Sequence, residues 1–323
     1  GFTKYILDNK VNKSKNYMQF DGSKSIVIND SKGSLLNDYK GKSFLDNFNP
    51  NGKSFSFDFW IYPNNISLGG GISPSVCIFE KYGNNEGFFI KAKNHNSTNS
   101  TCDISFIMSS NQNYFEFTFK IKLEKFQHIC FEVKNNLLEN SFHLYVNGKE
   151  INKSSSDVTI IGNINSLNLN FSSQEFKNSK VYIGNSSKLT HNLNNSVDVS
   201  FTGGFVGLID EFRFFSGKDR DFKDILKFKD ENIHSQENLK LYLRLNAPSG
   251  IYSNNHIVLD YSGNKLHGEL KSVTSTDHIN NIFSIIDNYV RNGIVSNDGE
   301  AIDIPLKYEK DNLNPILFSV HSH

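Results

Sequence analysis

The sequence predicts an all-β protein built as a sandwich or barrel of antiparallel sheets. Two observations support this: apolar and polar residues alternate with a period of two in many short segments, and clusters of Asn, Gly and Ser separate these segments. Aromatic residues make up 13% of the 323 residues, so core material is available although the mean hydropathy is -0.44. A chain this rich in aromatic residues is expected to fold.

The clearest predicted strand is Phe55–Ile61, in which every second residue is apolar and therefore lies on one face. Pro63 ends it. Further strands are predicted at Val76–Lys81, Phe88–Lys91, Asp103–Met108, Tyr114–Lys120, His128–Val133, Phe142–Val146, Leu167–Phe171 and Val181–Ile183. Asn147 and Gly148 follow one of these strands and predict a tight hairpin turn, because both residue types tolerate a positive φ.

One segment, Asp219–Ile233, has the spacing of an amphipathic helix. After about residue 271 the periodic signal weakens. Residues 278–290 are open to two interpretations, a short helix or a pair of strands, and Pro305 and Pro315 interrupt the remainder of the chain.

Composition excludes several classes of function. The chain has 34 Lys+Arg and 34 Asp+Glu, and it lacks the basic excess that counterion release to a nucleic acid requires. Its apolar runs are far shorter than the roughly 18 residues of a membrane span. The three cysteines, Cys77, Cys102 and Cys130, have no metal-binding spacing, and they leave open one disulfide with a free thiol or three buried thiols.

Four motifs, in this order, resemble the laminin-G-like or concanavalin-A-like jelly-roll family. They are Gln19–Gly22 with the strand Ser25–Ile28, then Phe55–Pro63, then Lys125–Cys130 with Leu144–Gly148, and finally Tyr182–Asn185 with Phe205–Phe215. These stretches are similar to the family's F-D-G turn, its F-T-I-S-A-W-V-x-P strand, its W-x-H-V-A strand with an L-Y-V-N-G hairpin, and its I-D-E-V-R-I-Y strand. The resemblance covers about residues 17–233 and implies a two-sheet antiparallel jelly-roll sandwich with a short helix. Phe126 departs from the pattern, since the family more often has Trp there.

A fifth stretch bears on domain organisation. Leu239–Asn246 and Val258–Gly268 look like a family segment that in many relatives precedes the F-D-G strand, whereas here it comes last. We therefore predict a laminin-G-like jelly-roll domain over residues 1–238. Residues 239–323 are predicted to be a trailing β-rich extension or a partial second module.

Asp21 and Asp210 are the candidate metal ligands. The first and last strands of a jelly roll tend to lie near one another, so these carboxylates could converge on Ca²⁺ together with backbone carbonyls. The alternative is that Asp21 caps its turn and Asp210 accepts a hydrogen bond from a strand-end amide. No other cofactor is expected.

Other conspicuous side chains favour structural roles. Glu211 and Arg213 share a face of their strand and are interpreted as an exposed ion pair of small value. Trp60 is expected in the core rather than in a sugar-binding platform, and His128 is expected to be a structural histidine.

No enzyme activity is expected. The glycosidases of this fold carry E-x-D-x-E on one strand, so that two carboxylates flank the scissile bond, and this motif is absent from the sequence. Nucleophile-elbow, H-E-x-x-H and phosphate-loop motifs are absent as well.

The sequence thus favours a noncatalytic recognition or adhesion module that binds a glycan or an extracellular protein through loops or one sheet face. The resemblance implies a secreted or cell-surface location. The alternative is a structural scaffold domain in a larger extracellular assembly, and a diverged glycoside hydrolase is the third interpretation. The sequence names neither the ligand nor its contact residues.

Overall fold

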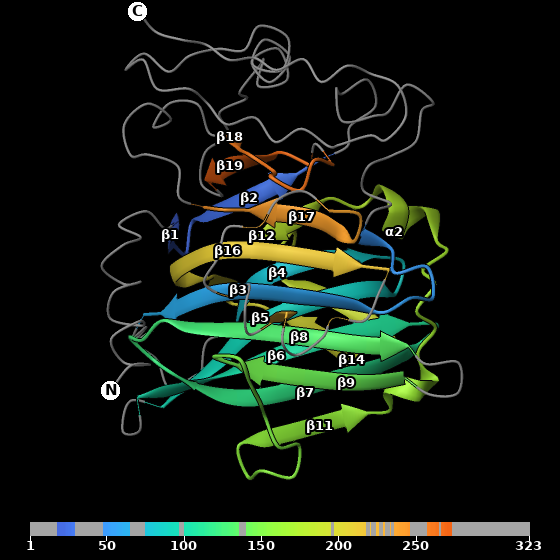
Figure 1. Ribbon diagram of the computed structural model, residues 1–323, viewed down its shortest axis with the longest axis horizontal. Coiled ribbons are helices and arrows are strands. Elements are labelled where there is room, and N and C mark those ends of the chain that lie inside the picture. Colours follow the sequence, from blue (N-terminus) through green and yellow to red (C-terminus); the bar gives the residue numbers. More distant parts are fainter. Residues whose placement is uncertain are drawn as a thin grey trace, which may run out of the picture.

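The computed structural model describes residues 18–29, 48–64, 75–96, 100–135, 140–194, 197–217, 220, 224–225, 229, 233, 236–245, 257–264 and 266–272. In this part of the chain two large β-sheets, which we call sheet A and sheet B, lie face to face (Figure 1). The all-β, two-sheet jelly-roll prediction is confirmed.

Sheet A has seven strands. Their order is β1 (Met18–Asp21), β16 (Val206–Ser216), β3 (Phe55–Pro63), β8 (Gln127–Asn135), β9 (Asn140–Val146) and β10 (Lys149–Glu150), and β17 (Leu239–Leu243) also pairs with β16. All these pairs are antiparallel. Asn147 and Gly148 have φ angles of 53° and 76° and connect β9 to β10 as the predicted hairpin turn.

Sheet B has ten strands. Their order is β11 (Val158–Gly162), β7 (Asn113–Lys122), β6 (Thr101–Ser110), β5 (Glu86–Asn96), β4 (Ser75–Gly83), β12 (Val181–Ile183), β2 (Lys24–Ile28), β19 (Gly268–Ser272) and β18 (Ile257–Val258), with the short β15 (Gly203–Gly204) parallel to β4. A separate two-stranded hairpin is formed by β13 (Thr190–Asn194) and β14 (Val197–Ser200). In Figure 1, β18 and β19 lie at one end of the molecule and β11 lies at the other.

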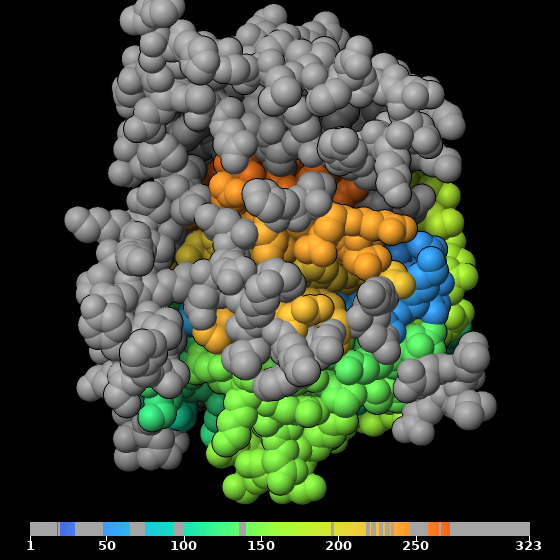
Figure 2. Space-filling view, viewed as in Figure 1, coloured from blue at the N-terminus to red at the C-terminus, as the bar shows by residue number. Residues whose placement is uncertain are grey.

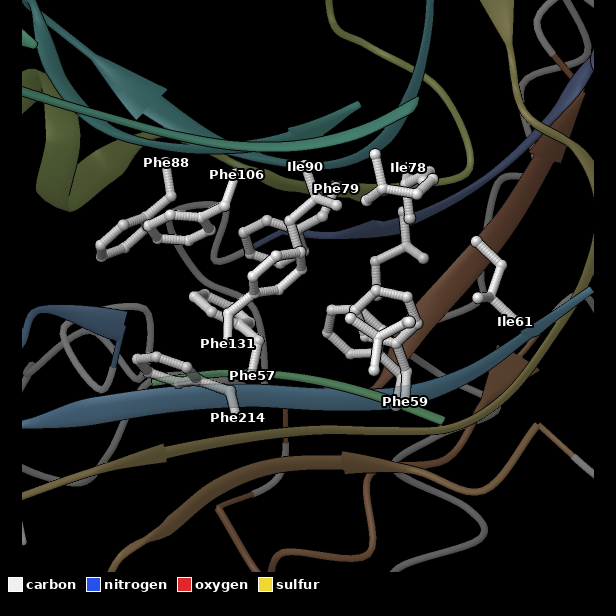
Figure 3. Close-up of a cluster of buried hydrophobic side chains, with 14 of the residues drawn as sticks. Phe57, Phe59, Ile61, Ile78, Phe79, Phe88, Ile90, Phe106, Phe131 and Phe214 are labelled. Carbon is white, nitrogen blue, oxygen red and sulfur yellow. The ribbon is translucent and has the colours of Figure 1, made fainter. Parts of the chain in front are cut away.

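The Phe surplus fills the space between the sheets. Phe57 of sheet A is fully buried, and its ring centroid lies 4.8 Å from that of Phe79 in sheet B and 4.6 Å from that of Phe214 in β16. Figure 3 shows these side chains pointing from the two sheets toward one another. Alternation in the strands thus places one set of apolar residues in this core.

The predicted strand at Leu167–Phe171 is wrong. This stretch has no strand and connects the 3₁₀ helix η2 (Ile164–Ser166) to the short helix α2 (Gln174–Asn178). Leu167, Leu169 and Phe171 are nevertheless buried. The alternating pattern arises here because every second side chain packs on the core, although the segment pairs with no described strand. The predicted helix Asp219–Ile233 and the segment 278–290 lie largely or wholly outside the described residues.

Residues 239–272 add strands to both sheets. β17 pairs with β16 in sheet A, and β19 pairs with β2 in sheet B. The buried carboxylate of Asp260 joins them, because it accepts hydrogen bonds from the backbone N–H groups of Tyr242 and Leu266, each at 2.9 Å. The described part of the predicted C-terminal region is therefore an extension of the same sandwich. A domain division at residue 238 stays a prediction.

Candidate functional site

The middle of the outer face of sheet A is covered. The outward side chains of β3 and β8 that line it are at most 4% exposed: Asp58, Trp60, His128, Cys130 and Glu132. Residues that come after β16 cover them, since the Trp60 indole donates to the Lys229 carbonyl at 2.7 Å and the Arg220 backbone N–H donates to Glu132 at 2.9 Å. A ligand would have to displace this covering chain.

A charge network under that covering chain holds it in place. The Asp58 carboxylate accepts a hydrogen bond from Arg220, and it lies 3.6 Å from the Arg213 guanidinium and 3.5 Å from His128 Nε2. Burial by itself would raise the pKa of Asp58, but Arg220, His128 and Arg213 hold it far below its usual value. Burial lowers the pKa of His128, which favours its neutral form. The predicted structural role of His128 agrees with this position.

The outer face of sheet B is covered only in part. The β13–β14 hairpin packs Leu193, Val199 and Phe201 on three outward apolar residues of the sheet, Cys77, Phe89 and Ile107. At the margin of this contact, the Tyr82 hydroxyl donates to the Asn192 carbonyl at 2.6 Å. Beyond the hairpin, toward β11, the outward residues become polar.

We call Lys91, Ser105, Tyr114, Glu116 and Thr118 the polar strip; they lie on the outer face of β5, β6 and β7. Their inward neighbours belong to the core, which fixes this orientation. In register, Ser105 lies opposite both Lys91 and Thr118, so the strip crosses three adjacent strands. At about 4.8 Å between strands it spans roughly 10 Å.

Contacts among the members preorganise the strip. Lys91 Nζ lies 3.1 Å from Glu116 Oε1, with the two side chains 13% and 18% exposed. Thr118 Oγ1 lies 3.3 Å from the same oxygen and 2.7 Å from Ser105 Oγ. Tyr114 is half-buried against the hairpin contact. The strip therefore offers a partly exposed ammonium group, a carboxylate and the Thr118 hydroxyl next to an aromatic ring, whereas the Ser105 hydroxyl is buried, at 1% exposure, and supports Thr118 from below.

The strip is poorly arranged for glycoside hydrolysis. Two acidic residues of sheet B are candidates for a second catalytic carboxylate beside Glu116. Glu80 is aligned with Glu116 across the sheet but lies three strands away. Asp103 lies on the neighbouring strand β6, four residues from Ile107, which is the residue opposite Glu116. Both separations come to about 14 Å between backbones, whereas paired catalytic carboxyl groups stand about 5–9.5 Å apart.

A second polar cluster, beneath the hairpin, is closed to solvent. Glu80 and His191 are each 2% exposed and lie 3.2 Å apart, and Ser186 Oγ lies 2.9 Å from His191 Nε2. The Ser186 hydroxyl and the Glu80 carboxylate both contact Nε2 of His191. In a catalytic triad the serine and the carboxylate contact opposite nitrogens of the histidine ring. Burial raises the pKa of Glu80, but hydrogen bonds from His191, Ser186 and Ser187 outweigh it and leave the pKa lowered. This cluster fastens the hairpin to the sheet.

The structure does not bring Asp21 and Asp210 together. Asp21 lies opposite Val206, four residues along β16 from Asp210, which corresponds to about 13 Å. The Asp21 carboxylate accepts a hydrogen bond from the Ser23 backbone N–H at 3.0 Å and pairs with Lys24 at 3.4 Å, as the turn-capping alternative predicts. Asp210 is 4% exposed. Within the described ranges, no group of three or more His, Cys, Asp and Glu side chains could hold a metal ion.

These residues therefore do not fit a calcium ion shared by the two carboxylates. Calcium binding as such stays a prediction.

One structural assignment needs correction. Glu211 and Arg213 form an ion pair at 2.5 Å, but they are 5% and 0% exposed, and Tyr242 of β17 contacts both side chains. The Arg213 guanidinium also lies over the Tyr242 ring at 4.9 Å. Trp60 is buried, as expected for a structural residue, but on the outer face of sheet A and not in the cluster between the sheets.

Sequence reasoning missed the polar strip. The signal was present in Tyr114–Lys120, where polar residues occupy every second position, but alternation alone does not say which face stays open. Knowing that requires the position of the β13–β14 hairpin. All three cysteines are free and buried, which settles the alternative left open by the sequence.

Comparison with known proteins agrees with the fold. A family model described as the concanavalin A-like lectin/glucanases superfamily matches residues 37–218, more than half of the chain. A search of curated proteins gave no match.

Solved structures with a similar fold include a candidate carbohydrate binding protein from Bacteroides ovatus (15% identity, TM-score 0.42, 82% of this chain and 61% of that chain). Others are the receptor binding domain of botulinum neurotoxin type G (11%, 0.35, 54% and 37%) and the CBM40 of a Ruminococcus gnavus sialidase bound to α2,3 sialyllactose (8%, 0.35, 67% and 97%). This chain thus spans about three fifths of the Bacteroides protein and under half of the toxin domain. From the family match, the chain belongs to the concanavalin A-like lectin/glucanase superfamily.

Proposed function

We propose that this protein is a noncatalytic glycan-recognition module that binds its ligand on the outer face of sheet B, at the polar strip. The observation that carries the proposal is the network that joins Lys91, Glu116, Thr118 and Ser105 on that face. Sugar hydroxyls need both donors and acceptors, and the strip holds both in fixed positions beside Tyr114.

The electrostatics favour an uncharged glycan. Lys91 and Glu116 neutralise one another, and the whole chain has a net charge of +0. A charged ligand would find little attraction at long range. Preorganisation also lowers the entropic cost of binding, because the side chains are already ordered by their mutual hydrogen bonds.

We infer from the family that the module works outside the cell. The thiols are compatible with an oxidising environment, because burial raises the pKa of Cys102 to about 12 and raises that of Cys77 and Cys130 well above the usual value. Every helix in the described part of the chain is too short or too polar to cross a membrane.

The test is a glycan array, followed by titration calorimetry with the best neutral hit. The double variant Lys91→Ala/Glu116→Ala removes the centre of the strip and is expected to weaken binding at least about tenfold, as loss of one or two hydrogen bonds to charged groups implies. The matched control is Lys271→Ala/Glu269→Ala, which removes an ion pair of 2.9 Å near the opposite edge of the same sheet. The control should bind like the wild type.

Equal affinities of the two double variants would place any glycan site elsewhere. If no glycan binds but one protein is recovered stably from the native source, the scaffold role gains support and the glycan proposal fails.

A further inference from the structure

The outermost strand of sheet B is unusually apolar for a sheet edge. β11 pairs with β7, and in the described chain no other strand adjoins it. Residues 159–162 are all exposed, with Ile160 44% and Ile161 42% exposed. Figure 2 shows the green end of the molecule, where Figure 1 places β11, clear of the residues drawn in grey.

Native sheet edges usually carry Lys, Pro, a bulge or a covering loop that prevents pairing with another chain. β11 reads Val-Thr-Ile-Ile-Gly and contains neither a charge nor a proline. Its pairing with β7 runs through all five residues without a register shift. The strand is therefore a regular, uncharged template for a further strand.

We propose that β11 pairs antiparallel with β11 of a second copy of this chain, with Ile160 on the two-fold axis. Thr159 of each copy then lies opposite Ile161 of the other, so β-branched side chains meet on both faces of the joint. A two-fold axis requires such a self-complementary patch, and this strand supplies one. The proposal stands independently of the function proposed above.

The flanking charges permit this pairing. The charged residue next to the strand is Asp157, which pairs with Lys120 of its own copy at 3.5 Å. In the proposed register the two Asp157 residues lie at opposite ends of the joint, about 20 Å apart, which exceeds the Debye length at physiological salt. Like charges therefore do not face one another, and this favours a second copy over a charged partner.

The contact is small. A five-residue edge with two half-exposed isoleucines buries well under the roughly 1,200 Å² of a stable interface, so we expect a weak dimer that forms at high concentration. Pairing would join two copies of sheet B into one sheet and place their two polar strips on one continuous face.

The decisive experiment uses single cysteines in the otherwise intact chain. Ile160→Cys places two thiols opposite each other on the axis, within the Cα separation that a disulfide needs, and mild oxidation should give a covalent dimer. Asp157→Cys lies at a more exposed position, 66% against 44% for Ile160, but about 20 Å from its copy, and it should stay monomeric. The native thiols are buried and do not interfere.

Sedimentation equilibrium of the unmodified chain provides the second readout. The apparent mass should rise with concentration toward about twice that of the monomer. Ile161→Lys should abolish the rise, whereas Leu189→Lys should keep it, since Leu189 is 67% exposed but lies away from β11. A mass that stays monomeric up to about 1 mM, a range in which weak contacts are populated, would overturn the proposal. Equal cross-linking of the two cysteine variants would do so too.

Discussion

Replacing Asp58 by alanine should destabilise this protein more than any surface substitution. The carboxylate is 1% exposed and serves two arginines, Arg220 and Arg213, together with His128. Alanine would leave two guanidinium groups buried beneath the covering chain without their shared counter-charge. Removing one partner of a buried ion pair costs about 3–5 kcal/mol.

We expect a loss of free energy of unfolding in the upper part of that range, because Asp58 also anchors the covering chain. Arg220 is held by its guanidinium on Asp58 and by its backbone N–H on Glu132, and its guanidinium lies 4.0 Å over the Phe215 ring. Without Asp58, the Arg220 guanidinium loses its hydrogen-bond acceptor at a position where the side chain is only 8% exposed. Asp58→Asn keeps the volume and should cost less, because one amide oxygen still accepts a hydrogen bond.

The measurement is the free energy of unfolding from urea titration, with Lys120→Ala as control. Lys120 belongs to an exposed ion pair, with side chains 47% and 66% exposed, and its loss should cost under about 1 kcal/mol. Because the folded-state pKa of Asp58 is depressed, its contribution is present above the unfolded pKa near 4 and is lost as pH falls below it. A cost for Asp58→Ala equal to that of the control would refute this reasoning.

Four further predictions concern other parts of the molecule. Phe57→Ala should lower the free energy of unfolding by about 3–5 kcal/mol in the same titration, because it opens a cavity between the sheets; a cost below about 1 kcal/mol would contradict the described core. The pKa of Glu80 is lowered, so its stabilisation should be present above about pH 4 and lost as pH falls further, and Glu80→Gln should flatten that part of the stability curve. A thiol reagent should find no reactive cysteine in the native protein and three after denaturation, whereas one would indicate a disulfide. Calcium at about 1 mM tests the calcium prediction that remains, a site other than one shared by Asp21 and Asp210: it should raise the melting temperature relative to a chelator control, and an unchanged value would end the prediction.

The fold could be predicted because its signals are local. Alternation along Phe55–Ile61 and the turn residues Asn147 and Gly148 each specify one strand or one turn. Family motifs supplied the order of these elements. The same local logic failed at Leu167–Phe171, where alternate residues are buried although no partner strand adjoins them.

The site could not be predicted, because it depends on which face stays open. Glu116 and Arg213 both occupy outward positions of amphipathic strands, yet Glu116 is part of an accessible strip and Arg213 is fully buried. The difference comes from covering segments, the β13–β14 hairpin on one sheet and the chain after β16 on the other. Alternation cannot place such segments, since the hairpin is far in sequence from β4, β5 and β6, and the chain after β16 is far in sequence from β3 and β8.

The unequal covering of the two sheets is itself a functional argument. On sheet A the charged side chains pair internally, and their partners on the covering chain exclude a ligand. On sheet B the hairpin covers the apolar outward residues, including Phe89 and Ile107, together with Glu80, and leaves the Lys91–Glu116 pair partly accessible. Covering apolar area stabilises the fold, whereas covering the Lys91–Glu116 pair would cost desolvation free energy and add little stabilisation. The accessible strip is therefore the part of the sandwich surface that the fold does not need to bury, and this leaves it available to a ligand.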